Sequence, residues 1–394
     1  MSLGKTYLAV LATILFVGCQ NLPERTSPPE RGAASRTRTS VIKASVPTPA
    51  PAPAATPTPA LALPPLRPVE TNEFPVVVLD EPTSFPSPSP LPNIQPYWPR
   101  EWVNVWVPLE SWGKFNGFSK PTQLTAGLDP SFQLQTSNGP VLIKIGSHSA
   151  NFDGLEYGLG FAPRLIRGLP YIHSLDAQKT FQALLNALFP LPGPNRVVVI
   201  DPGHGGKDSG TRSVLGRDLE KQYTLDWALR LEQQLRLRGW TPILTRTNDS
   251  DVPLPYRVAM ADRVEADLFI SLHLNSGGSN RELTGIETYC LTPTGMPSNL
   301  TREFEDDPRE SHPNNLYDDQ NVLLGTRLHR SLLRATGAVD RGVRHARFMA
   351  VLRGQNRPAV LIEGGYLSNA TEARRLAAPE YRQAMAEAIA RGLE

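Results

Sequence analysis

The sequence predicts a C-terminal α/β domain with a twisted, mostly parallel sheet flanked by helices, preceded by a small α+β domain and a disordered proline-rich linker. The α/β domain is predicted because three apolar, largely β-branched runs have the pattern of strands buried on both faces, and a helical pattern follows the first. The linker is predicted because 20 of the 39 prolines fall between Pro23 and Pro99. Outside that stretch the composition is ordinary for a folded chain.

Residues 1–19 have the pattern of an export signal. An apolar run over residues 7–17 has the length of a signal-peptide core and is too short to span a bilayer comfortably. It ends in Leu15-Phe-Val-Gly-Cys19, which resembles the lipobox of bacterial lipoproteins, although Phe16 stands where leucine is usual. The resemblance implies that Cys19 is lipidated and anchors the chain to a membrane, because two acyl chains suffice for stable attachment. The alternative is an ordinary secretory signal.

Residues 20–96 are predicted to be a disordered tether, rich in Pro, Ala, Thr and Ser. Such a composition buries too little apolar surface to offset its ordering entropy, and its prolines favour polyproline II. At ~3.1 Å per residue, it would reach up to roughly two hundred ångströms from a membrane. Gln20 is not the Asp that commonly signals inner-membrane retention, so the outer membrane is favoured in a cell with two. The folded part would then face the periplasm or cell wall.

Charge and cysteine content exclude two classes of protein. The formal charge is +2, and a nucleic-acid binder needs a strongly basic face. The two cysteines, Cys19 and Cys290, imply no disulfide framework. Cys290 lies in an apolar strand-like stretch, where we expect an inert buried thiol.

Residues 97–190 are predicted to form the small α+β domain. Strands are expected at 104–108, 141–145 and 159–161, and helices at 109–116 and 174–188. The segment resembles the small repeat domain named after the N-terminal domain of copper amine oxidases, which implies an accessory role in wall binding or spacing. His148 and His173 are isolated and lack metal-ligand spacing.

In the C-terminal domain, residues 195–394, each predicted strand is followed by a His or Glu. The strands are expected at 196–201, 267–272 and 358–362, and the residues are His204, His273 and Glu363. Open α/β folds keep their ligands at the carboxyl ends of parallel strands. Glycines around His204 and after Glu363 leave room for close approach. The loop around His204 is no phosphate cradle, because it lacks both G-x-G-x-x-G and a P-loop lysine.

Two imidazoles and a carboxylate form the ligand set of a catalytic zinc with its fourth position open to water. Such a metal lowers the pKa of its water, but the attack still needs a base. Two carboxylates are available: Glu220, near the start of a helix predicted over 218–239, and Glu363. One would be the ligand and the other the base, and the residues alone leave the choice open.

Four blocks resemble the successive motifs of the zinc-dependent N-acetylmuramoyl-L-alanine amidases of type 3, from about Val197 to the C-terminus. The blocks are Val199-Ile-Asp-Pro-Gly-His-Gly-Gly-Lys-Asp-Ser-Gly, Leu219-Glu-Lys, Ile270-Ser-Leu-His-Leu-Asn-Ser and Ala359-Val-Leu-Ile-Glu-Gly-Gly-Tyr-Leu-Ser-Asn. The resemblance implies that His204, Glu220 and His273 bind Zn²⁺ and that Glu363 is the catalytic carboxylate. Gly364 departs from the family, where Thr is usual.

The resemblance also implies the activity: hydrolysis of the amide bond between N-acetylmuramic acid and L-alanine in peptidoglycan, by zinc-activated water. Arg353 or a backbone N–H is a candidate to assist in stabilising the oxyanion. The enzymatic alternative is another zinc peptidoglycan peptidase or a carboxypeptidase. A non-catalytic wall-binding lipoprotein is a further alternative, against which the full ligand set argues. An activating protein cannot be named from the sequence.

The remaining polar residues are expected to have supporting or structural roles. Asp201 and Asp208 are predicted to be loop-shaping acceptors or to support the metal ligands from behind. Three other histidines match no ligand position and are expected at the surface or in helices: His312, His329 and His345.

Two further segments of the C-terminal domain have recognisable patterns. The polar, acidic residues 293–319 are long for a connection in a compact domain, which indicates a functional loop or lid. Residues 379–393 are alanine-rich and amphipathic, and they are predicted to form a helix packed on the sheet.

Overall fold

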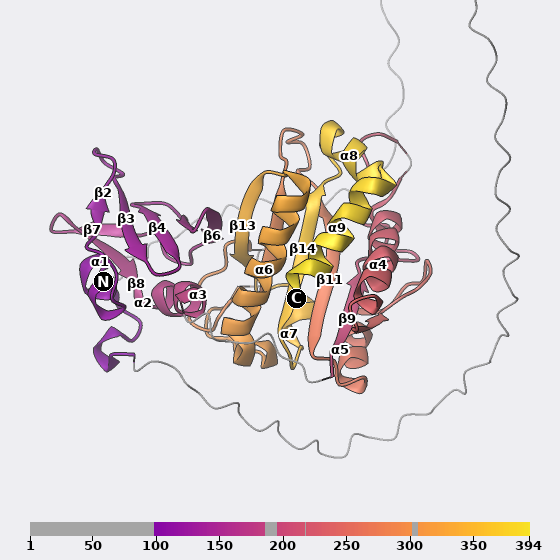
Figure 1. The fold of residues 1–394 in the computed structure, drawn as a ribbon, viewed down its shortest axis with the longest axis horizontal. Coiled ribbons are helices and arrows are strands. Elements are labelled where there is room, and N and C mark those ends of the chain that lie inside the picture. Colours follow the sequence, from indigo (N-terminus) through magenta and orange to yellow (C-terminus); the bar gives the residue numbers. More distant parts are fainter. Residues whose placement is uncertain (1–97, 186–194, 217, 302–305) are drawn as a thin grey trace, which may run out of the picture. The chain divides into compact units, whose positions relative to one another are not determined.

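The computed structural model describes residues 98–185, 195–216, 218–301 and 306–394 (Figure 1). These residues belong to one compact unit, Ser89–Glu394. The predicted signal segment 1–19 and the tether 20–96 lie outside them, and so does the end of the helix expected at 174–188. Among the described helices, none is long and apolar enough to cross a membrane.

Six strands of the C-terminal part form a mixed, largely parallel sheet in the order β10-β9-β11-β14-β12-β13. The first four are mutually parallel, β12 runs antiparallel to β14, and β13 runs parallel to β12. The bounds are β9 Val197–Pro202, β10 Thr241–Leu244, β11 Leu268–Asn275, β12 Ile286–Cys290, β13 Asp340–His345 and β14 Ala359–Tyr366. The predicted α/β class is confirmed, and the three predicted strands correspond to β9, β11 and β14.

Helices cover both faces of this sheet (Figure 1). On one face α4 (Glu220–Arg236), α6 (Asp318–Thr336) and α9 (Pro379–Gly392) pack through buried residues such as Trp227, Leu328 and Ile389. On the other face α5 (Leu254–Arg263) and α7 (Ala350–Arg353) pack through a second cluster that includes Ala261 and Leu352. Helix α8 (Ala370–Ala377) follows β14. The predicted C-terminal helix is α9.

Cys290 is buried at the end of β12, as predicted. Its Sγ donates a hydrogen bond to the carbonyl oxygen of Asn321 in α6, at 3.2 Å. The mid-helix Gly325 lets α6 approach the sheet closely, since a Cβ there would lie 3.2 Å from this sulfur. The thiol is therefore part of the packing between α6 and β12.

The N-terminal part consists mainly of antiparallel strands. Strands β2 to β6 extend the large sheet beyond β13, and β1, β8 and β7 form a separate three-stranded sheet. The bounds are β1 Trp106–Pro108, β2 Thr122–Gln123, β3 Ser131–Thr136, β4 Gly139–Lys144, β5 Ser149–Phe152, β6 Leu155–Gly158, β7 Arg164–Ile166 and β8 Leu169–His173. The helical segments are η1 Arg100–Trp102, α1 Leu109–Phe115, α2 Ser174–Asp176, η2 Ala177–Gln182 and α3 Ala183–Leu185.

The prediction of a strand at 159–161 is wrong. Leu159–Phe161 is irregular and follows β6, because the backbone N–H groups of Gly160 and Phe161 donate to the buried carboxylate of Asp176 instead of to a neighbouring strand. The strands at 104–108 and 141–145 correspond to β1 and β4. Strand β6 meets β13 at the pair Tyr157 and Val343, so both parts share one sheet. The division into domains at residues 190–195 stays a prediction.

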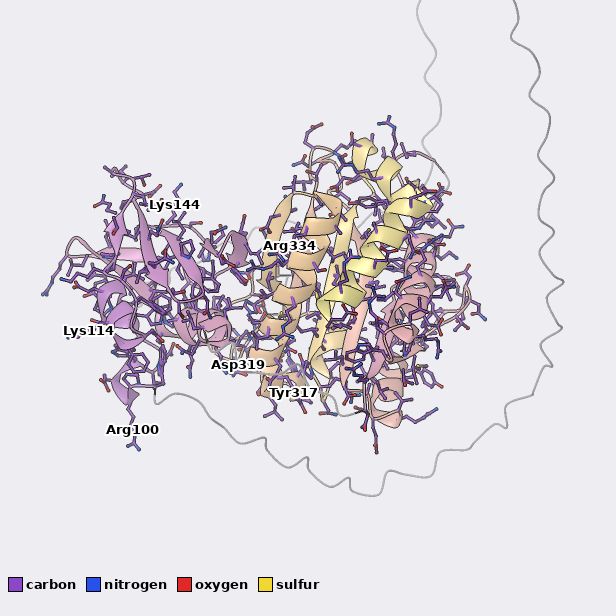
Figure 2. The ribbon with its side chains drawn as sticks, in the orientation of Figure 1. Arg100, Lys114, Lys144, Tyr317, Asp319 and Arg334 are labelled. Carbon is purple, nitrogen blue, oxygen red and sulfur yellow. The ribbon has the colours of Figure 1, made fainter. Side chains whose placement is uncertain are left out.

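The long connection between β12 and α6 lies at the amino-terminal edge of the parallel strands. Because β12 runs antiparallel to β14, it ends near the start of β14. The side chain of Asn314 donates to the carbonyl oxygen of Arg357, just before β14, and η3 (Pro313–Tyr317) contacts α7. Figure 2 shows Tyr317 and Asp319 at one end of α6 and Arg334 toward the other.

The indole of Trp227 is the largest side chain that α4 packs on the sheet. A Cβ at Gly364 would lie 2.9 Å from its Cζ3 atom, so the ring lies directly on the backbone of β14. We expect Trp227→Ala to lower the free energy of unfolding by about 3–5 kcal/mol, because it leaves a cavity in the core. Urea unfolding followed by circular dichroism measures the change.

The matched control is Leu229→Ala, on the same helix but 36% exposed. A surface substitution of this kind is expected to change stability by less than about 0.5 kcal/mol. Equal losses in the two variants would show that α4 does not depend on this contact.

Candidate metal centre

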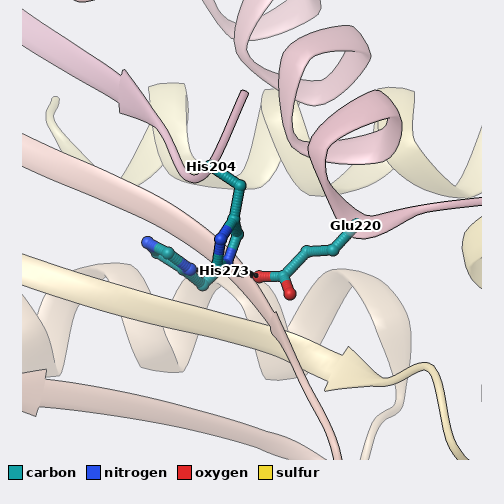
Figure 3. A group of neighbouring side chains, drawn as sticks. All are labelled: His204, Glu220 and His273. Carbon is teal, nitrogen blue, oxygen red and sulfur yellow. Dashed lines mark hydrogen bonds and ion pairs between the residues drawn. The ribbon is translucent and has the colours of Figure 1, made fainter. Parts of the chain in front are cut away.

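Three side chains converge at the carboxyl ends of β9 and β11. His204 follows β9, Glu220 is the first residue of α4, and His273 lies near the end of β11 (Figure 3). Their potential ligand atoms all lie within 4.8 Å of one another. The structure therefore brings together the three residues that the sequence selected as ligands.

The loop after β9 needs glycines because its backbone passes very close to the side chains of this cluster. A Cβ at Gly203 would lie 2.3 Å from Cε1 of His273, and one at Gly210 would lie 2.6 Å from both Glu220 and His204. His204 itself has a φ of 63°, in the left-handed region. Gly203 and Gly205, which flank His204, have no side chains and so leave room for this strained backbone conformation.

Glu220 links the two imidazoles. Its Oε1 atom lies 3.1 Å from Nε2 of His204 and 3.0 Å from Nδ1 of His273, and the carboxylate also accepts the backbone N–H groups of Thr211 and Leu274. Burial favours the neutral acid, but the hydrogen bonds and charges of the two histidines outweigh it and hold the pKa of Glu220 well below its usual range. Glu220 is therefore an anion, as a metal ligand must be.

Asp208 supports His204 from the opposite side of the ring. Its Oδ2 atom lies 2.8 Å from Nδ1 of His204. Burial lowers the pKa of His204, but contacts with Glu220 and Asp208 raise it above the usual value. When Nδ1 donates to Asp208, Nε2 presents its lone pair to the cluster, which is the usual arrangement behind a metal-binding histidine. Asp208 thus contacts His204 directly, and its support of a metal ligand stays a prediction.

Two buried arginines hold the loop carbonyls and were missed by the sequence reasoning. Arg246 donates to the carbonyl oxygens of Pro202 and Gly203, and Arg257 donates to those of Pro202 and His204. Arg257 also pairs with the buried Asp201 at 2.8 Å, which gives that residue a loop-shaping role. The signal that would have found Arg246 is its position two residues after the end of strand β10.

Glu363 lies beside the cluster on the neighbouring strand β14. It is the register partner of His273, so the two side chains share a face of the sheet. Its Oε2 atom is buried and has no hydrogen-bond partner among the described residues. Burial, with the nearby negative charges of Glu220 and Glu287, raises the pKa of Glu363 well above its usual range. This carboxyl group is thus able to take up and hold a proton.

Glu287 on β12 is a second carboxylate that the sequence reasoning did not single out. It is the register partner of Glu363 and is 3% exposed. Four side chains donate to it: Asn275, Tyr289, Arg341 and Tyr366. The sequence Gly285-Ile-Glu-Thr-Tyr contained the signal, an acid inside an otherwise apolar strand.

The structure places the remaining histidines away from the cluster. His329 is buried in α6, with its ring nitrogens bound to Thr288 and Asp340. His345 is buried in β13, so its predicted place at the surface or in a helix is wrong. Burial lowers the pKa of His345 to about 4.

Arg353 and the long connection are also remote from the cluster. Arg353 ends α7, which precedes β14, so it lies at the opposite edge of the sheet from Glu363. The suggestion that it assists at the cluster is wrong. The described residues of the connection, 293–301 and 306–319, lie at that same opposite edge and do not cover the cluster.

Comparisons with known proteins identify the family of the C-terminal part. Residues 198–394, half of the chain, match the family model described as N-acetylmuramoyl-L-alanine amidase. The amidase AmiA of Escherichia coli is 31% identical over 51% of this chain and 76% of its own length. The amidase LytC of Bacillus subtilis is 34% identical over 50% of this chain, which spans only 35% of that relative.

A solved structure also matches the C-terminal part. The catalytic domain of the amidase CwlV from Bacillus (Paenibacillus) polymyxa var. colistinus is 34% identical, with a TM-score of 0.41, over 50% of this chain and 94% of that domain. The family match extends from β9 to the C-terminus and so includes His204, Glu220, His273 and Glu363. The chain belongs to the N-acetylmuramoyl-L-alanine amidase family.

Proposed function

We propose that the chain is a zinc-dependent peptidoglycan hydrolase that cleaves the amide bond between N-acetylmuramic acid and L-alanine. The observation that carries the proposal is the convergence of His204, Glu220 and His273 beside a carboxyl group, Glu363, that has no partner of its own. Membership in the amidase family supplies the substrate. The family's activity also implies that the enzyme works outside the cytoplasm, at the cell wall.

The three convergent residues fit a zinc ion. Two imidazole nitrogens and one carboxylate oxygen are the donor set of many catalytic zinc sites, which keep a fourth position for water. When bound, zinc supplies Lewis-acid chemistry that acidifies water and polarises the amide carbonyl. Glu220 contributes the negative charge, and Asp208 fixes the tautomer of His204 through the 2.8 Å contact with Nδ1.

In the proposed mechanism, Glu363 carries the proton. It takes a proton from the attacking water and delivers it to the nitrogen of the leaving L-alanine. Between these steps it must hold the proton, for which its buried Oε2 atom and anionic neighbours are suited. Its unpaired Oε2 atom is free to accept from water, because no protein group among the described residues competes for it.

The first prediction here concerns Glu363→Gln, which keeps the shape of the side chain and removes the base. We expect the rate of hydrolysis of purified peptidoglycan to fall about 10²–10⁴-fold, with bound zinc unchanged. The products of the full-length protein, analysed by mass spectrometry, should be stem peptides with a free L-alanine amine.

Glu380→Gln, an exposed acid on α9, is the control and should retain full activity. Comparable rates for Glu363→Gln and wild type would contradict the mechanism. Release of terminal D-alanine by the wild-type enzyme would instead identify a carboxypeptidase.

The second prediction concerns Asp208→Ala. Loss of a carboxylate behind a metal-binding histidine typically weakens metal affinity about 10–100-fold. We expect this loss in a competition with a zinc chelator that is followed without substrate. Glu282→Ala removes an exposed acid from the loop between β11 and β12 and should leave the affinity unchanged. An unaltered affinity in Asp208→Ala would show that Asp208 only shapes the loop.

We further propose that Cys19 is lipidated and that residues 20–96 tether the enzyme to a membrane. The lipobox-like sequence before Cys19 supports the anchor. The part that follows the tether, residues 97–190, is proposed as an accessory module for binding or spacing at the wall. Together these segments would keep the hydrolase at its polymeric substrate.

Labelling with radioactive palmitate tests the anchor. We expect Cys19→Ala to lose the label and to move from the membrane fraction to the soluble fraction. Cys290→Ala is the control and should keep the label, because Cys290 is buried in the fold. Label that persists in Cys19→Ala would exclude this attachment site.

A further inference from the structure

The side chains of the metal centre belong to a polar row that crosses four adjacent strands. His273 on β11 is the register partner of Glu363 on β14, and Glu363 is the partner of Glu287 on β12. On β13, Asp340 is the register partner of Ile286, so the next residue, Arg341, lies beside Glu287. The Nε atom of Arg341 donates to Glu287 at 2.8 Å. The row therefore runs His273, Glu363, Glu287, Arg341.

One edge of the Arg341 guanidinium is free to bind a ligand. The Nε atom is used by Glu287, and the group lies 5.3 Å from the centre of the Tyr366 ring. Among the described residues no hydrogen bond is recorded for either Nη atom of Arg341, and neither is buried without a partner. The side chain is 25% exposed. Two parallel N–H groups in this arrangement match the two oxygens of a carboxylate.

Arg341 supplies the positive charge that pairs with Glu287, but this contact uses only one edge of its guanidinium. Glu287 already accepts hydrogen bonds from the side chains of Asn275, Tyr289 and Tyr366. Arg341 adds only its Nε contact and leaves the rest of its guanidinium toward solvent. Glu287 and Tyr366 thus hold the free edge in a fixed orientation.

The proposed mechanism implies that the peptide part of the substrate lies over Glu363, Glu287 and Arg341. Glu363 delivers the proton to the leaving nitrogen, so the peptide departs on the side of the metal centre where Glu363 lies. Neighbouring strands are ~4.8 Å apart, which puts Arg341 roughly 10 Å beyond Glu363. An extended peptide covers ~3.3–3.6 Å per residue, so this distance corresponds to about three residues.

We propose that Arg341 forms a carboxylate-binding subsite for the peptide part of the substrate, about two or three residues from the amide that is cleaved. The inference rests on the proposed function and names a feature of the same site. The ligand is an acidic peptide, bound through the free Nη edge of Arg341. The subsite selects substrates by charge and takes no part in the proton transfers.

Two synthetic probes test the subsite: N-acetylmuramoyl-L-Ala-D-Glu-L-Ala with free carboxylates, and N-acetylmuramoyl-L-Ala-D-Gln-L-Ala amide. For the full-length enzyme we expect kcat/KM to be about 10–100-fold higher for the acidic probe, the range of a charged hydrogen bond. Arg341→Met should abolish this preference, mainly by raising KM for the acidic probe, so that kcat/KM falls about 10–100-fold more for the acidic probe than for the amidated one.

Arg341→Lys keeps a charge beside Glu287 but lacks the bidentate edge, so its kcat/KM should fall about 3–10-fold more on the acidic probe than on the amidated one. Arg327→Met, an exposed arginine on α6, is the control and should behave as wild type with both probes. Circular dichroism confirms that each variant is folded.

The outcomes separate this inference from the proposed function. Equal kcat/KM for the two probes in the wild-type enzyme would overturn the subsite while leaving the amidase activity standing. An equal loss on both probes in Arg341→Met would also overturn it, by showing that Arg341 acts only through Glu287. Failure of the wild-type enzyme to cleave either probe or peptidoglycan would overturn the proposed function itself.

Discussion

The register between neighbouring strands is the constraint on which the site depends. In a strand, successive side chains point to opposite faces, so a slip of one residue would move a side chain to the other face of the sheet. The pairing of His273 with Glu363, and of Glu363 with Glu287, places all three on one face. A slip of one residue in β14 would keep His273 in the cluster but turn Glu363, the proposed proton carrier, to the other face of the sheet.

The cluster also depends on a loop that has almost no regular structure. Its glycines allow the close approaches, but glycine gives the chain freedom without fixing it. Arg246 and Arg257 hold the loop in one conformation, because each buried guanidinium donates hydrogen bonds to two of its backbone carbonyl oxygens. Leaving these carbonyl groups without a hydrogen bond would destabilise the fold. The loop that carries His204 is thus positioned by side chains from two other segments of the chain.

Local pattern was enough to predict the parts of the site that follow parallel strands. His204, His273 and Glu363 each follow a buried apolar run, and the carboxyl ends of parallel strands meet at one edge. Glu287 could not be found in this way, because β12 is antiparallel to β14 and places the acid near its beginning. The same reversal places the described residues of the connection, 293–301 and 306–319, at the far edge, so they do not cover the metal centre.

Glu363 and Glu287 show how environment divides two adjacent carboxylates between two roles. Both lie on one face of neighbouring strands, but Glu287 receives four donors, one of them charged. These donors contact both oxygens of its side chain and hold them in place. The Oε2 atom of Glu363 receives no hydrogen bond from the described residues. The negative charge of Glu287 beside it favours the protonated form of Glu363. The donors around Glu287 therefore fix its position, and the negative charge that it places beside Glu363 raises the pKa of the carboxyl group that we propose exchanges a proton.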